Sequence, residues 1–173
     1  MTITELNLAI KLINENFTTD DYDFCSPITR ETIISVEKIL NLELPLSYKG
    51  FISALGCGDI KGSEINGIIK NEVFSEDHWG PIGSLNLVWL TLNDRKEYGL
   101  PEHILLIYSL GDGSYYALDV SQMDAEGECP VVYWPLDGYE ATPKLEIVAK
   151  DFGEFFLNLI QDKIADKKKS TEA

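Results

Sequence analysis

Side chains that could act as nucleophiles or proton carriers are few in this chain of 173 residues. There are three cysteines, Cys25, Cys57 and Cys129, and two histidines, His78 and His103. Hydrolysis needs a nucleophile, a base beside it and a group that orients the base. The possible pairs of nucleophile and base are Cys57 or Cys129 with His103, and no known catalytic sequence motif contains these residues. We therefore predict no catalytic residue and keep a small Cys/His hydrolase as the less favoured alternative.

Metal, disulfide and phosphate chemistry find no better support in the spacing of residues. The cysteines are odd in number and widely separated without a CxxC pair, which predicts three reduced thiols and no zinc site. The chain has no HExxH, and acidic residues 119–128 lack the alternating oxygen ligands of an EF-hand loop. Gly111-Asp112-Gly113 precedes a predicted strand, so it predicts a hairpin turn and no phosphate-binding loop. We expect no metal and no cofactor.

Residues 97–143 have the most unusual charge pattern of the chain. They contain nine acidic residues and no basic one, where about four basic residues would be expected at the whole-chain rate. Aromatic side chains lie among these carboxylates, a mixture that suits an interface with a basic protein. A solvated acidic edge with buried aromatics is the other interpretation. The residues assigned to the predicted partner-binding face are Asp112, Tyr115, Asp119, Asp124, Glu126, Glu128 and Trp134.

The whole chain is acidic as well, with 29 Asp and Glu against 14 Lys and Arg and a net charge of −15. This charge repels phosphate backbones and anionic lipid, so we expect neither direct nucleic-acid binding nor a membrane partner. No segment approaches the ~18 apolar residues of a membrane-spanning helix, and the N-terminal residues do not resemble a signal peptide. We therefore predict a cytoplasmic protein.

Apolar periodicity predicts helices towards both ends of the chain and strands in the middle. The helices are expected at residues 3–14, from Ser26-Pro27 to about residue 40, from Pro45 to Gly56, from Ser84 to about residue 98, and from Asp151 onward with Glu154 in a capping box. The strands are expected at Ile65–Ile69, Ile104–Tyr108, Tyr115–Asp119 and Val131–Trp134. A loop is predicted at Thr18–Asp23.

This order of elements does not alternate as βαβ units do. We therefore predict an α+β fold in a single domain, with a mainly antiparallel sheet flanked by helices. Along the chain we distinguish an N-terminal helix and acidic loop (residues 1–24), the α+β body (residues 25–164) and a flexible, lysine-rich tail (residues 165–173).

Several short motifs follow one another in a characteristic order. They are EKILNLELPLSYKGFI at 37–52, YGLP at 98–101, GDG at 111–113 followed by YALD at 116–119, GECPVV at 127–132, and DFGEFF at 151–156. Together they resemble the SUKH superfamily of Smi/Knr-like proteins over roughly residues 28–160. The resemblance implies an α+β fold without catalytic residues, and it offers no guide to the N-terminal helix.

Many bacterial members of this superfamily are similar to immunity proteins, whereas fungal members resemble signalling or cell-wall regulators. The resemblance therefore implies an antitoxin that binds and neutralises a cognate protein toxin. A basic nuclease domain is one candidate partner, because its own nucleic-acid site must be basic. A regulatory interaction module unrelated to toxins is the alternative within the binding class.

Overall fold

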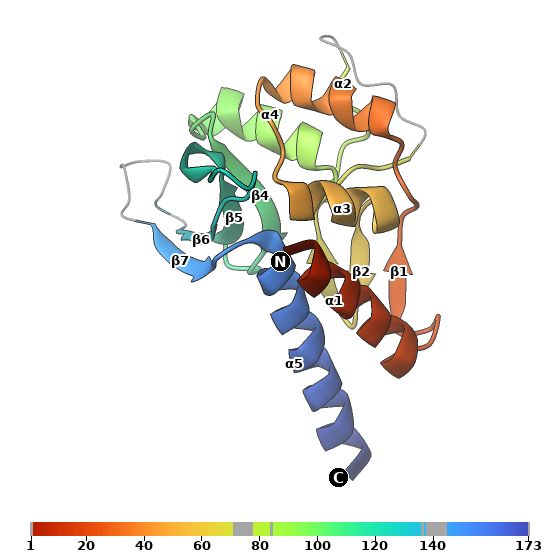
Figure 1. The fold of residues 1–173 in the computed structure, drawn as a ribbon. Helices are drawn as coiled ribbons and strands as arrows, with labels where there is room; N and C mark the ends of the chain where they lie inside the picture. The colour runs from red at the N-terminus through yellow and green to blue at the C-terminus, as the bar shows by residue number, and fades with distance from the viewer. Residues whose placement is uncertain (1, 71–77, 84, 136, 138–144, 173) are drawn as a thin grey trace.

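The computed structural model describes residues 2–70, 78–83, 85–135, 137 and 145–172. Helices and strands follow one another along this part of the chain (Figure 1). Their order is α1 (Thr2–Asn16), β1 (Tyr22–Phe24), α2 (Arg30–Leu40), α3 (Leu46–Leu55), β2 (Gly58–Ile60), β3 (Ser63–Ile65), α4 (Leu87–Tyr98), β4 (Ile104–Ser109), β5 (Tyr115–Asp119), the 3-10 helix η1 (Val120–Gln122), β6 (Val131–Trp134), β7 (Glu146–Ala149) and α5 (Phe152–Glu172).

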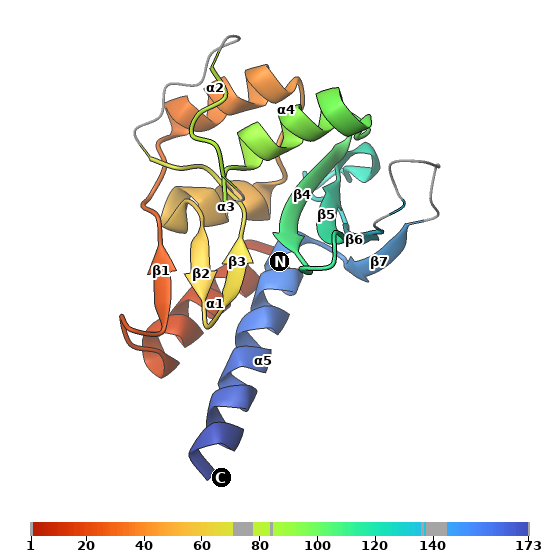
Figure 2. The ribbon, with the colours of Figure 1, turned by 180° about the vertical axis from the view of Figure 1, so that it is seen from behind.

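The strands β1 to β7 form one sheet in chain order, and each strand is antiparallel to the next. β3 and β4 pair at one position, Ile65 opposite Tyr108, so the sheet has a short part, β1–β3, and a longer part, β4–β7. Figure 2 shows the two parts beside each other, with their hairpin turns at the same end of the sheet. The predicted single-domain α+β fold with an antiparallel sheet and flanking helices is confirmed.

Two hydrophobic clusters lie on opposite faces of the longer part of the sheet. β4 is buried on both faces, because Leu105 and Ile107 face the larger cluster and Ile104 and Leu106 face the smaller one. The larger cluster joins α1, α2, α3 and α5 to the sheet and contains packed aromatic rings, such as those of Tyr48, Phe51, Phe152 and Phe156. The smaller cluster lies under α4 and includes Leu90, Leu100 and Trp134.

The N-terminal helix and the C-terminal residues pack on the body of the domain. Leu6, Ala9 and Ile13 of α1 are buried in the larger cluster. α5 continues to Glu172, so residues 165–172 of the expected flexible tail are helical in this structure. Lys167 donates from Nζ to the carbonyl oxygen of Asn16 at 2.9 Å and to Asp21 Oδ2 at 3.0 Å. The C-terminal part of α5 therefore contacts the end of α1 and the residues that follow it.

Several boundaries differ from the sequence prediction. β1 overlaps the loop predicted at Thr18–Asp23, and β2 and β7 were not predicted. The strand expected at Ile65–Ile69 was misplaced, since β3 ends at Ile65. α2 begins at Arg30 with Thr29 as its N-cap, well after Ser26-Pro27, because the Thr29 side chain accepts from Thr32 N. α4 has Asn86 as its N-cap, with its side chain accepting from Val88 N and Trp89 N. The predicted cap, Ser84, lies outside the described residues.

The prediction of three reduced cysteines was wrong. Cys25 and Cys57 form a disulfide with an S–S distance of 2.05 Å, and Cys129 is the free, buried cysteine. The two partners meet because β1 pairs with β2, and the chain just beyond them continues the ladder: Cys25 N donates to the Cys57 oxygen at 2.7 Å. The spacing in the sequence concealed this pairing, since β1 and β2 are each only three residues long.

Candidate partner-binding surface

The acidic segment predicted to bind a partner does not form one face. Asp112 and Tyr115 lie at the hairpin end of β5, whereas Asp119 to Glu128 follow its other end. β5 has five residues, so its two ends are about 13 Å apart at the usual rise per residue. The seven predicted residues are therefore divided between two parts of the surface and the interior.

The connection between β5 and β6 uses its carboxylates to hold its own backbone. Asp119 Oδ1 accepts from Ser121 N at 3.1 Å and from Ser121 Oγ at 2.6 Å, and Gln122 Nε2 donates to its Oδ2 at 2.7 Å. Asp124 Oδ1 accepts from the backbone nitrogens of Glu126 and Glu128 at 2.8 and 3.0 Å. These bonds satisfy backbone donors that the turns leave without a partner, so the two carboxylates stabilise the loop.

Glu128 connects this loop to the first turn of α3. Its Oε1 accepts from Ser47 N at 2.8 Å, and its Oε2 accepts from Ser47 Oγ at 2.7 Å. Pro45, the N-cap residue, makes no side-chain capping bond. Glu128, from a distant part of the chain, therefore accepts from one of the N–H groups that have no partner within the helix. Burial raises the pKa of the Glu128 carboxyl, and the bonds from Ser47 partly oppose this rise.

Three of the seven predicted residues are therefore internal. Asp119, Glu128 and Trp134 expose between 1% and 5% of their surface. Asp119 caps η1, Glu128 accepts a hydrogen bond from the first turn of α3, and Trp134 belongs to the hydrophobic cluster under α4. A buried side chain cannot present its charge or ring to another protein without a rearrangement of the fold. We leave these three residues out of the candidate surface.

The other four predicted residues reach the surface to different extents. Asp112, Asp124 and Glu126 are exposed, and Tyr115 is half-buried. Asp112 Oδ1 accepts from Ser114 N at 2.9 Å and also from Ser114 Oγ, and these bonds lower the pKa of the Asp112 carboxyl. Burial, together with the charge of Asp94, raises the pKa of Tyr115. Asp112 is thus held as a charged group at the tip of the β4–β5 hairpin.

A groove lies beside Asp112, between the β2–β3 and β4–β5 hairpins. Its volume is about 430 Å³, and its lining residues are Asp59, Gly62, Glu64, Tyr108, Ser109, Leu110 and Gly111. The first hairpin turns sharply because Lys61 and Gly62 both have positive φ, of 51° and 79°. Because β3 pairs with β4, residues from both turns line this one groove, and Figure 2 shows each turn at the lower end of its hairpin. This groove is the candidate partner-binding surface.

The groove combines charged and apolar groups, as protein interfaces do. Leu110 is 37% exposed, and the acidic residues Asp59 and Glu64 line the same groove. Tyr108 is fixed by a hydrogen bond of 3.0 Å between its hydroxyl and Ser63 Oγ. None of these lining residues was predicted from the sequence. The alternation of polar and apolar residues on either side of Lys61-Gly62 was the one signal for the first hairpin.

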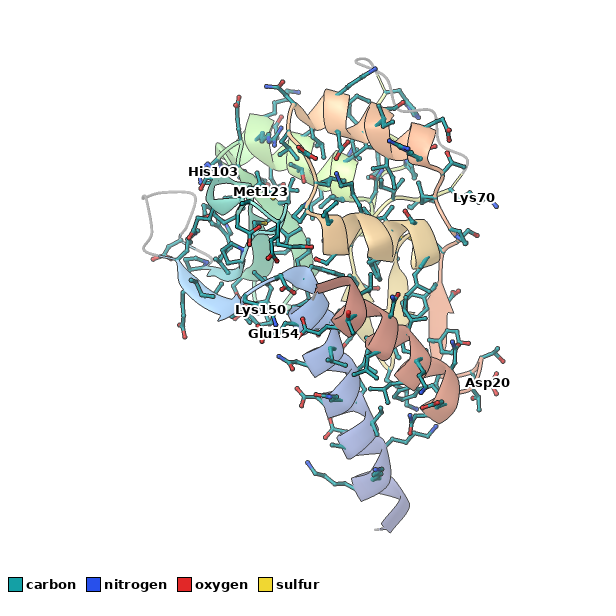
Figure 3. All side chains as sticks on the ribbon, in the orientation of Figure 1. Asp20, Lys70, His103, Met123, Lys150 and Glu154 are labelled. Atoms are coloured by element: carbon teal, nitrogen blue, oxygen red, sulfur yellow. A yellow bond between two sulfur atoms is a disulfide. The ribbon has the colours of Figure 1, made fainter. Side chains whose placement is uncertain are left out.

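The cysteines and histidines do not assemble a nucleophile in the described part of the chain. Cys57 is bonded to Cys25. Burial raises the pKa of the Cys129 thiol, and the nearby charges of Asp119 and Glu128 raise it further, so it is not a thiolate near neutral pH. His103, labelled in Figure 3, is exposed, and its Nε2 lies 4.0 Å from Asp119 Oδ1. The pairs proposed for a hydrolase thus lack an activated sulfur in this structure.

In the described ranges, no three His, Cys, Asp or Glu side chains are placed to hold a metal ion. None of the described helices combines the length and the apolar character that a membrane span requires.

The fold and the family agree. The structure defines a single-domain α+β protein with an antiparallel sheet in chain order and a groove between two hairpins. The SUKH family model described as SMI1-KNR4 cell-wall matches residues 6–161, which is most of the chain. The protein belongs to this family. The match begins within α1, so it includes most of the N-terminal helix that the motifs left without a counterpart.

Proposed function

We propose that this protein is an immunity protein that binds a cognate toxin and neutralises it. The observation that carries the proposal is the family match over residues 6–161, since immunity proteins are a known group within the superfamily that the motifs resemble. The acidic surface supports a basic partner, because a net charge of −15 attracts cationic proteins over distance.

A nuclease domain suits this surface as the toxin. Its nucleic-acid site must carry Lys and Arg, and an inhibitor can place carboxylates where phosphates would otherwise lie. In the candidate groove, Asp59 and Glu64 supply charge and Leu110 supplies an apolar contact. Exposed Asp112 adds a carboxylate at the tip of the neighbouring hairpin.

The test uses the toxin domain encoded beside this protein's gene. Titration calorimetry should give a one-to-one complex, and the purified protein should abolish the toxin's activity at equimolar concentration. Co-expression should restore growth of cells that produce the toxin. Binding without inhibition would favour a regulatory interaction module, and the absence of any complex would contradict the proposal.

A matched pair of variants tests whether the groove takes part. Leu110→Arg places a cation in the groove, and we expect it to weaken toxin binding by about tenfold or more. Ile82→Arg makes the same change at another exposed apolar residue, which is 81% accessible and lies outside the groove. We expect this control to change the affinity less than about twofold. Equal effects of the two substitutions would exclude the groove as the contact.

A further inference from the structure

Three carboxylates form a row across the short part of the sheet. In the strand register, Asp23 of β1 lies opposite Asp59 of β2, and Asp59 lies opposite Glu64 of β3. Directly paired residues in antiparallel strands point to the same face, so the three side chains are neighbours. We call Asp23, Asp59 and Glu64 the carboxylate row.

The row faces away from the hydrophobic core. The residues that alternate with it along the strands, Tyr22, Phe24, Ile60 and Ile65, pack into the larger cluster. Figure 2 shows β1–β3 in front of α1 and α3, with none of the described helices drawn over their outer face. One end of the row borders the groove, because Asp59 and Glu64 also line it. Among the described residues, no helix therefore covers the outer face of β1–β3.

No cation neutralises the row in the described part of the chain. None of its carboxylates takes part in an ion pair there. Lys61 lies in the turn between β2 and β3, but its Nζ is 2.8 Å from Asp21 Oδ1. The row also accepts few hydrogen bonds. Asp59 Oδ1 accepts from Gly62 N at 3.3 Å, and no described residue donates to the carboxylates of Asp23 and Glu64.

Like charges placed directly opposite each other destabilise a sheet, so the pairing of these three carboxylates costs stability. We propose that the outer face of β1–β3 is a docking surface for an arginine-bearing segment of a basic protein partner. Adjacent carboxylates can each accept from one edge of a planar guanidinium, and Leu110 can contact the apolar part of the same segment. This inference rests on the proposed function and names the surface that performs it.

The first experiment maps the surface with a defined probe, a capped octapeptide of alternating arginine and threonine. NMR spectra of the amide groups should be recorded during titration at about 150 mM salt. We expect the shifts to concentrate at residues 22–24, 58–65 and 109–113. Shifts spread evenly over the molecule, or concentrated at residues 120–128, would overturn the inference.

Two double variants with the same change in charge separate the row from net charge. Asp59→Asn with Glu64→Gln should weaken octapeptide binding by about fivefold or more. Glu146→Gln with Asp162→Asn neutralises two exposed carboxylates on β7 and α5, and we expect a loss below about twofold. Equal losses would show that the peptide responds to total charge alone and would overturn the docking surface.

The same variants give a readout that needs no partner. Relief of cross-strand repulsion should raise the melting temperature of the Asp59→Asn/Glu64→Gln variant by about 2 °C relative to the control variant. A melting temperature equal to or below that of the control would contradict the repulsion on which the inference depends.

The cognate toxin distinguishes failure of this surface from failure of the proposed function. If the toxin binds wild type and the Asp59→Asn/Glu64→Gln variant equally, the docking surface is refuted and the proposed function stands. If the toxin does not bind at all while the octapeptide maps to the row, the proposed function fails and the docking surface stands.

Discussion

Two acidic regions of this protein use carboxylates in opposite ways. In the β5–β6 loop, Asp119, Asp124 and Glu128 accept hydrogen bonds from nearby backbone and side-chain donors. In the carboxylate row, Asp23 and Glu64 accept no described hydrogen bond and lie beside another carboxylate. The loop is prominent in the sequence, whereas the row is not. The number of acidic residues in a segment therefore does not identify an interface, and the donors around each carboxylate are more informative.

The difference should also appear in stability. Carboxylates of the loop satisfy groups that would otherwise lack partners, so their removal destabilises the protein. Carboxylates of the row repel one another, so their neutralisation is expected to be neutral or stabilising.

Removal of the disulfide should have the largest effect. Cys25→Ser with Cys57→Ser opens a connection between residues 32 apart in the sequence, which corresponds to about 4 kcal/mol of unfolding free energy. Denaturant unfolding without a reductant measures this loss. Hydrogen exchange should show that protection falls in β1 and β2, which carry part of the row, and remains in the β5–β6 loop. Unchanged unfolding free energy would show that the bond does not contribute to stability.

Truncation of Glu128 should destabilise the protein by about 2 kcal/mol, because Ser47 loses the acceptor for its N–H and hydroxyl inside the fold. Truncation of Glu64 should change the unfolding free energy by less than about 0.5 kcal/mol. Glu128→Ala and Glu64→Ala are compared by thermal and denaturant unfolding. Glu128→Gln is the control, since its amide oxygen can still accept one of the bonds. Similar losses for the two alanine variants would remove the contrast between the regions.

The pH dependence of stability should be opposite for Glu128 and Asp21. Because the pKa of Glu128 is raised, the folded protein binds this proton more tightly than the unfolded chain does. The unfolding free energy therefore falls as pH rises from the ordinary pKa of 4.5 through the raised pKa. Hydrogen bonding from Lys61 lowers the pKa of Asp21, so its contribution is present above the ordinary value of 3.8 and is lost as pH falls below it.

Urea unfolding across acidic to neutral pH tests these signs with Glu128→Gln and Asp21→Asn. Glu128→Gln should remove the decline in stability with rising pH that its carboxyl causes. Asp21→Asn should reduce the loss of stability on acidification. The assignment of either group fails if its variant follows the same pH dependence as wild type.

Long, strongly patterned elements could be predicted from the sequence, and short ones could not. The helices near residues 3–14 and 45–56 and the strands β4, β5 and β6 follow clear apolar patterns. β1, β2 and β3 have three residues each, too few for a pattern to stand out. The sequence therefore predicts a loop where β1 begins, and it gives no sign that Cys25 pairs with Cys57.

The candidate site depends on contacts between distant parts of the chain, which composition does not reveal. Ser47, the partner of Glu128, is 81 residues away, so the structural role of this carboxylate had no local signal. The carboxylate row exists only through the register of three strands. The sequence correctly indicated an acidic protein of this family. It could not indicate which carboxylates are occupied by internal donors.

The most direct test compares association rates of the cognate toxin with charge-reversal variants of the two regions. Asp59→Lys with Glu64→Lys reverses part of the row, and Glu102→Lys with Glu126→Lys reverses exposed residues near the β5–β6 loop. Glu128 is left unchanged because a lysine there would bury an unpaired charge. Stopped-flow rates at low and high salt should fall by about tenfold or more for the row variant and less than about threefold for the loop variant. A larger fall for the loop variant would contradict the assignment of the row as the contact.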